Sequence, residues 1–120
     1  MRDYKKLQVW EKSHQLTLEM YQMLFTYPKE ETFGLVSQMK RSSSSIPTNI
    51  AEGAGRFTNK DFARFLSIAY GSCNELEYQI ILSRDLNYID LDKGEKLFQK
   101  IKEIRKMLYA LINKLNNTES

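Results

Sequence analysis

The feature that most constrains the fold is a 3-4 spacing of apolar residues in the second half of the chain. One set occupies the last segment: Leu97, Ile101, Ile104, Leu108, Leu111 and Leu115. Another precedes it: Phe62, Leu66, Ala69, Cys73, Leu76 and Ile80. This spacing places each set along one side of an α-helix, as in helices that pack at a shallow angle in a bundle. No segment of useful length alternates between apolar and polar residues with a period of two, so we predict no β-strands.

The first half of the chain predicts two more helices. The helix over residues 7–26 is apolar along two lines, which indicates that it packs against two neighbours. Pro28 ends it. The next helix covers residues 30–53 and is expected to kink at Pro47, because proline lacks an N–H and clashes with the preceding turn.

The last two helices have recognisable N-caps. One is predicted over residues 59–87, capped by Thr58 or Asn59, and the other over residues 91–116, capped by Asp90 or Asp92. Short connections place consecutive helices antiparallel. The predicted fold is therefore all-α: an antiparallel, up-down four-helix bundle forming a single domain over residues 1–120.

Composition limits the class of protein. A chain of 120 residues with 42% hydrophobic residues can bury one globular core. No segment reaches about 18 consecutive apolar residues, and the N-terminus lacks an apolar signal core, so we expect a cytoplasmic protein with no membrane span. The single cysteine, Cys73, excludes an internal disulfide and predicts a buried, unreactive thiol.

Residues 42–56 interrupt the helical pattern with hydroxyls, a proline and two glycines. Asn49 and Glu52 are three residues apart on the second predicted helix, and Ser72 and Glu75 are three apart on the third. The two pairs meet here if these helices are neighbours. With one further residue they form a predicted polar network: Gln38, Asn49, Glu52, Ser72 and Glu75. Arg41 and Arg56 are nearby cations. We interpret the network as buried hydrogen bonds that fix helix register, with a polar pocket or a subunit contact as alternatives.

The run Ser45-Ile46-Pro47-Thr48-Asn49-Ile50-Ala51-Glu52-Gly53 resembles the central motif of a bacterial family. These are four-helix-bundle proteins encoded in intervening sequences of 23S rRNA genes, also called S23-type proteins. Three further stretches match: Leu7-Gln8-Val9-Trp10, Phe33-Gly34-Leu35 with Gln38, and Gly71-Ser72-Cys73-Asn74-Glu75-Leu76-Glu77. The resemblance implies a bundle that assembles into a ring, commonly a pentamer, and brings no settled activity. The chain is also similar to the accessory variability proteins of diversity-generating retroelements, which bind nucleic acid and a reverse transcriptase.

Two sets of residues are candidates for contacts with partners. The basic residues of the last helix are candidates for binding RNA or DNA: Lys93, Lys96, Lys100, Lys102, Arg105 and Lys106, with Lys114 and the N-terminal Arg2, Lys5 and Lys6 in addition. No sequence-reading motif is present, so such binding would be electrostatic. The alternative is a solvated face with internal ion pairs. First-helix aromatics are candidates for subunit contacts: Trp10, Tyr21, Phe25 and Tyr27.

Catalytic and metal-binding patterns are weak. Glu11-Lys12-Ser13-His14 has the Glu-x-x-His spacing of carboxylate-bridged di-iron bundles, but such a site needs a second histidine and His14 is the only one. No nucleophile–base pair or phosphate-binding loop is recognisable. We therefore predict a non-enzymatic homo-oligomer without cofactor or metal that binds nucleic acid through a basic face. The alternatives are a protein-interaction scaffold with no nucleic-acid role and a carboxylate–metal enzyme.

Overall fold

The structure, a computed structural model, describes residues 2–118 and contains four α-helices and two short 3-10 helices. The elements are, in order, η1 (Tyr4–Lys6), α1 (Gln8–Leu24), η2 (Lys29–Glu31), α2 (Leu35–Ala54), α3 (Asn59–Asp85) and α4 (Leu91–Asn116). Residues 2–118 contain no strand, and the predicted all-α four-helix bundle is confirmed. In the same range, no helix has the length and apolar character needed to cross a membrane.

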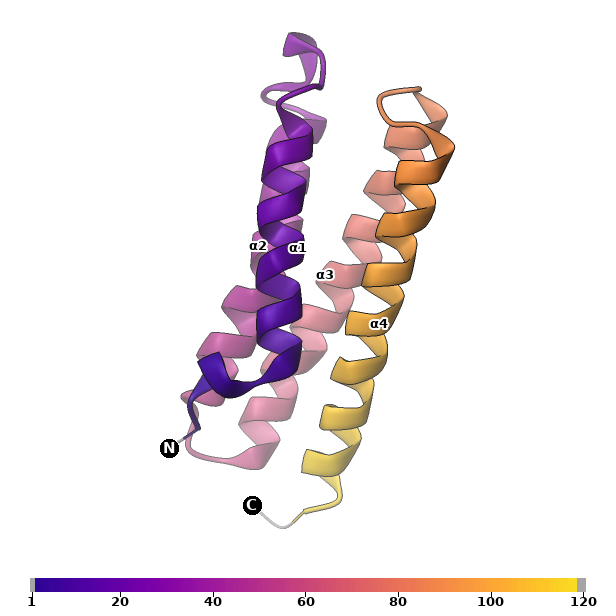
Figure 1. Ribbon diagram of the computed structural model, residues 1–120. Coiled ribbons are helices and arrows are strands. Elements are labelled where there is room, and N and C mark those ends of the chain that lie inside the picture. The colour runs from indigo at the N-terminus through magenta and orange to yellow at the C-terminus, as the bar shows by residue number, and fades with distance from the viewer. Residues whose placement is uncertain (1, 119–120) are drawn as a thin grey trace.

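The helices run alternately up and down along a body of 48 × 23 × 20 Å (Figure 1). α2 packs between α1 and α3, and α3 packs on α4. α1 and α4 close the bundle with the loosest of these contacts. Both chain ends and the α2–α3 connection lie at one end of the bundle, whereas the α1–α2 and α3–α4 connections lie at the other (Figure 1).

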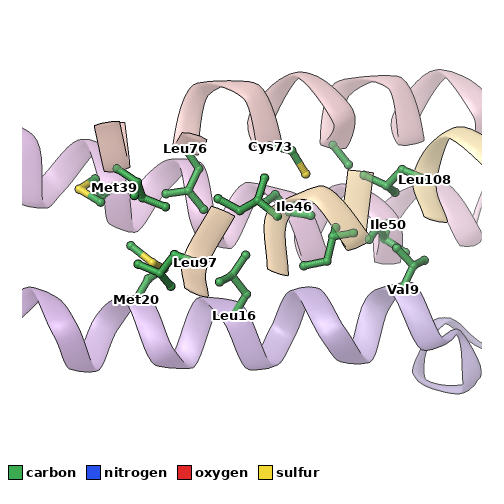
Figure 2. Close-up of a cluster of buried hydrophobic side chains, with 14 of the residues drawn as sticks. Val9, Leu16, Met20, Met39, Ile46, Ile50, Cys73, Leu76, Leu97 and Leu108 are labelled. Atoms are coloured by element: carbon green, nitrogen blue, oxygen red, sulfur yellow. The ribbon is translucent and has the colours of Figure 1, made fainter. Parts of the chain in front are cut away.

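The 3-4 apolar sets supply much of the core. All six α3 residues of the set are at most 2% exposed, and Leu97 to Leu108 of the α4 set are at most 1% exposed. Side chains from all four helices meet between them, such as Leu16, Ile46, Leu76 and Leu97 (Figure 2). Burying each such side chain contributes about 1.5–3 kcal/mol relative to leaving it exposed. The apolar periodicity therefore holds the bundle together.

Local chemistry sets the ends of α3 and α4. Thr58 and Asp90 are the N-caps, and each side chain accepts a hydrogen bond from the backbone N–H three residues later, at 3.0 and 2.7 Å. α3 ends at Asp85, two residues before the predicted end. Asn87 has a φ of 63°, and this left-handed conformation commonly follows a helix C-terminus.

α2 begins later than the sequence predicts. Residues 29–31 form η2, and α2 starts at Leu35 rather than near residue 30. The cause is Gly34, whose φ of −111° and ψ of −111° lie outside the helical region. From Leu35 the helix continues to Ala54 with Pro47 inside it. The expected kink at Pro47 stays a prediction.

α2 packs very closely on α3 at Gly53. A Cβ atom on this residue would lie 2.6 Å from the Cβ of Phe65 and 3.0 Å from Cδ1 of Phe62. No larger residue fits without moving one of the two helices. Gly53, which ends the Ile-Ala-Glu-Gly run, therefore has a packing role.

Candidate functional site

The centre of the predicted polar network forms between α2 and α3. Asn49 donates to the carbonyl and the hydroxyl of Ser45, at 2.8 and 3.0 Å. The Ser45 hydroxyl lies 2.9 Å from the Ser72 hydroxyl. Ser45 therefore joins two of the predicted residues, Asn49 and Ser72. Its position in the hydroxyl run, four residues before Asn49, was the signal that could have placed it in the network.

The other three predicted residues lie outside this centre. Glu75 pairs with Arg41, and both side chains are substantially exposed, at 38% and 61%. Gln38 and Glu52 are exposed and make no side-chain hydrogen bond within residues 2–118. Glu52 is three residues beyond Asn49 on α2, but its side chain is exposed where that of Asn49 is partly buried. The network is thus a short, partly buried chain of hydrogen bonds with a surface ion pair beside it.

A second polar cluster, which the sequence did not suggest, lies deeper in the same seam. Ser42 donates to the Gln79 side chain at 2.6 Å, and both residues are almost fully buried. Ser83 donates to the backbone carbonyl of Gln79 at 2.8 Å. A buried amide paired in this way specifies how α2 and α3 align.

The backbone group freed by Pro47 is satisfied from the neighbouring helix. Proline has no N–H to offer the carbonyl four residues earlier, which belongs to Ser43. The hydroxyl of Thr17 on α1 lies 2.9 Å from that carbonyl and donates to it. It lies equally close to the carbonyl of Ser13, so its single proton serves one of the two at a time. Nothing in the sequence pattern indicated Thr17.

Two of the α4 lysines are bound to a single carboxylate. Lys93 and Lys100 contact Glu19 of α1 at 2.9 and 2.6 Å. Partial burial raises the pKa of Glu19, but the hydrogen bonds from the two ammonium groups outweigh it, and the pKa lies below its ordinary value. These lysines therefore connect α1 to α4 and are not free cations.

Other candidate basic residues of α4 are also paired. Arg105 contacts Glu77 of α3 at 3.1 Å, and Lys96 pairs with Asp92 one turn earlier at the same distance. Within residues 2–118, only Lys102 and Lys106 of the six main candidates make no ion pair. The predicted basic face is therefore much less positive than its composition suggests.

An open groove separates α1 from α4. Its volume is about 620 Å³, and Leu16 and Ile104 are among its apolar lining residues. Lys12 and Glu103 bridge it with an ion pair of 2.9 Å in which both side chains are about half exposed. Charged side chains therefore close this seam where apolar packing is incomplete.

The predicted subunit-contact aromatics divide into two groups. Tyr27 is 7% exposed and packs on Tyr88 at 5.2 Å between ring centroids. Burial raises the pKa of its hydroxyl, which has no hydrogen-bond partner within residues 2–118. Because the Tyr27 side chain packs inside its own bundle, it is not available for a contact with another subunit.

The remaining aromatics lie along one side of α1, partly buried against the core at Trp10 and exposed at Tyr21 and Phe25. The Trp10 ring stacks on His14, with centroids 5.1 Å apart and 8° between planes. Farther along, Tyr21 is 40% and Phe25 is 82% exposed, and Leu18 between them is 51% exposed. Spacings of four, four, three and four place these five residues on one side of the helix. We call Trp10, His14, Leu18, Tyr21 and Phe25 the outer stripe.

Within residues 2–118, the side chains with catalytic chemistry are dispersed or unreactive. Within residues 2–118, no three His, Cys, Asp or Glu side chains come together as metal ligands would. Cys73 is fully buried, as expected, and burial raises the pKa of its thiol to about 12. A thiol in this state is protonated at neutral pH and is a poor nucleophile.

Two comparisons with known proteins find related chains. The family model described as 23S rRNA-intervening sequence protein matches residues 5–110. Among solved structures, the chain is similar to a protein with unknown function from the S23 ribosomal protein family of Bacteroides thetaiotaomicron VPI-5482. The two share 30% sequence identity with a TM-score of 0.78, over 87% of this chain and 97% of that chain. No curated protein matches the chain.

Proposed function

This chain belongs to the 23S rRNA-intervening sequence protein family, and we propose that it acts as a non-enzymatic, homo-oligomeric helical scaffold. The observation that carries this proposal is the outer stripe of α1. Its exposed members cannot be explained by the core of a single bundle. Contiguous apolar surface of this kind marks interaction sites.

A second copy of the chain is the proposed occupant of the outer stripe. From Trp10 to Phe25 the stripe extends over four turns of α1, roughly 22 Å at 1.5 Å per residue, which suits contact with another helix. Lys40 of α2 lies over the Tyr21 ring at 5.3 Å and adds a cation beside the stripe. The resemblance implies a ring, and a pentamer is the proposed number of subunits.

Solution mass tests the scaffold. We expect light scattering to give an oligomer several times heavier than the 14.1 kDa chain. Tyr21→Ser combined with Phe25→Ser should shift the protein to monomer with its helical circular dichroism unchanged. Phe33→Ser is the matched control, because Phe33 is 97% exposed and lies outside the outer stripe. A monomeric parent, or a double variant of unchanged mass, would contradict the proposal.

The chemistry of the candidate catalytic groups supports a role without catalysis. Cys73 is buried and protonated, and the His14 ring is stacked flat on Trp10. The free thiol also suits a reducing compartment, and we place the protein in the cytoplasm.

Nucleic-acid binding is the second proposed function. Lys102 and Lys106 are exposed, lie one turn apart on α4 and make no ion pair within residues 2–118. A ring of copies would multiply this excess and the formal charge of +3 per chain. The predicted similarity to retroelement accessory proteins supports the same function. The alternative stays a protein-interaction scaffold with no nucleic-acid role, and the binding experiment below separates the two.

A further inference from the structure

The two ends of the bundle carry opposite charge. At the end with the chain termini (Figure 1), residues 2–6 and 52–64 hold six Lys or Arg against three Asp or Glu, an excess of three positive charges. At the other end, residues 26–34 and 84–96 hold four Lys or Arg against six Asp or Glu, an excess of two negative charges. We call residues 2–6 and 52–64 the basic end.

The basic end is assembled by Arg2. Its guanidinium donates to the carbonyl of Arg56 at 2.8 Å and to the side chain of Asn59 at 2.5 Å. It also lies over the Phe62 ring, 4.7 Å from the centroid. These contacts fix the N-terminal segment against the α2–α3 connection. Exposed lysines from two distant parts of the sequence therefore lie at the same end of the bundle.

The positive charge at this end is less neutralised than that of α4. Asp61 is shared by Arg56 and Arg64, at 3.7 and 2.8 Å, so one carboxylate faces two guanidinium groups. The exposed lysines of the basic end make no ion pair within residues 2–118: Lys5, Lys6 and Lys60. A surface of this type attracts a polyanion.

An exposed aromatic ring, Phe57, lies at the basic end next to Arg56. Phe57 is 94% exposed in the α2–α3 connection and borders an open hollow of about 540 Å³. In contrast, the buried Phe65 ring is covered by the guanidinium groups of Arg56 and Arg64, at 4.6 and 4.5 Å. Phe57 is therefore the ring available to a ligand. Rings beside cations are the surfaces on which unpaired bases stack.

We propose that the basic end binds single-stranded nucleic acid, with an unstacked base on Phe57 and the phosphates on Lys5, Lys6 and Lys60. Glu52 and Asp61 also border the hollow and repel phosphate, so a base, not the backbone, fits beside Phe57. A duplex offers no free base face to a ring on a protruding connection. The inference rests on the proposed nucleic-acid function and moves its main site from α4 to the basic end.

Fluorescence anisotropy with the full chain tests the site. The probes are a labelled 15-nucleotide oligouridine and a duplex of the same length, titrated across a salt series. We expect the single strand to bind more tightly, and Phe57→Ala to weaken its binding about tenfold. Lys60→Gln should weaken both probes and reduce the slope of log affinity against log salt by about one. Both residues are exposed, so the variants should fold, which circular dichroism verifies.

The matched control is Lys29→Gln, which removes an exposed positive charge from the opposite end of the bundle. We expect its single-strand affinity to stay within about twofold of the parent. Loss of binding in Lys102→Gln with Lys106→Gln, but not in the Phe57 and Lys60 variants, would overturn the inference while keeping the nucleic-acid function. No binding by the parent at low salt would remove both. Unchanged affinity in Phe57→Ala would overturn the stacking role.

Discussion

The seam between α2 and α3 and the seam between α1 and α4 both contain polar side chains, but the side chains act differently. In the first, the Ser42 and Gln79 side chains are buried at 2.6 Å, and Gly53 leaves no space for a methyl group. In the second, lysines meet Glu19 at the border of an open groove. The comparison shows that enclosure decides the effect of a polar contact. Enclosed contacts fix helix register, whereas open ones respond to salt and pH.

The largest effect is expected at Gly53, where α2 packs very closely on α3. Gly53→Ala should lower the free energy of unfolding by about 3 kcal/mol, because the new methyl group overlaps the side chains of Phe62 and Phe65. Gly71→Ala is the control, since nothing lies within 4 Å of its added Cβ, and it should stabilise α3 by about 1 kcal/mol. Urea denaturation measures both. Equal stability of the two variants would show that the seam is not tight.

A smaller effect is expected for the buried hydrogen bond in the same seam. Gln79→Leu should cost about 2 kcal/mol, because it leaves the Ser42 hydroxyl without its short bond. Adding Ser42→Ala should recover most of this loss, since both partners are then apolar. A double variant as unstable as Gln79→Leu alone would mean that packing, not the hydrogen bond, causes the loss.

The smallest effect is expected at the open α1–α4 seam. Glu19→Gln should cost about 1 kcal/mol at pH 7, because the carboxylate holds two lysines. Its folded-state pKa lies below the ordinary 4.5, so this contribution is complete above pH 4.5 and is lost as pH falls through the lowered pKa. Denaturation of parent and variant at pH 7 and pH 3 should show a larger difference at pH 7 than at pH 3.

Glu103→Gln is the control for this prediction. Its pair with Lys12 is about half exposed, so its removal should change stability by less than about 0.5 kcal/mol at either pH. If Glu103→Gln lowered the stability as much as Glu19→Gln does, the exposure of the two carboxylates would not determine how much each contributes.

The sequence predicted the bundle because apolar periodicity is a local signal. The two 3-4 apolar sets were placed in the core by spacing alone, and all of their members are buried except Leu111 and Leu115, which are partly buried. Helix starts were less predictable. Glu30 and Glu31 resemble a first helical turn, but the backbone conformation of Gly34, which no spacing reveals, delays α2 until Leu35.

The candidate site was predictable only in part, because its contacts depend on the distance and rotation between helices. The spacing of Asn49 and Glu52 suggested a shared face, yet Asn49 bonds to Ser45, which in turn contacts Ser72 of α3, whereas Glu52 is exposed. The pairing of Lys93 and Lys100 with Glu19 joins residues more than seventy positions apart. Charge counting along α4 therefore described a basic face that the folded protein largely neutralises.

The hydrogen bond from Thr17 to the Ser43 carbonyl has a consequence for how the protein opens. α2 cannot complete its own backbone bonding at Pro47, so part of the helix depends on α1 remaining docked. Separation of α1 exposes that carbonyl and weakens the adjoining turns. The two helices are thus expected to open together as one cooperative unit, with amides around Pro47 and Thr17 exchanging their hydrogens at matching rates.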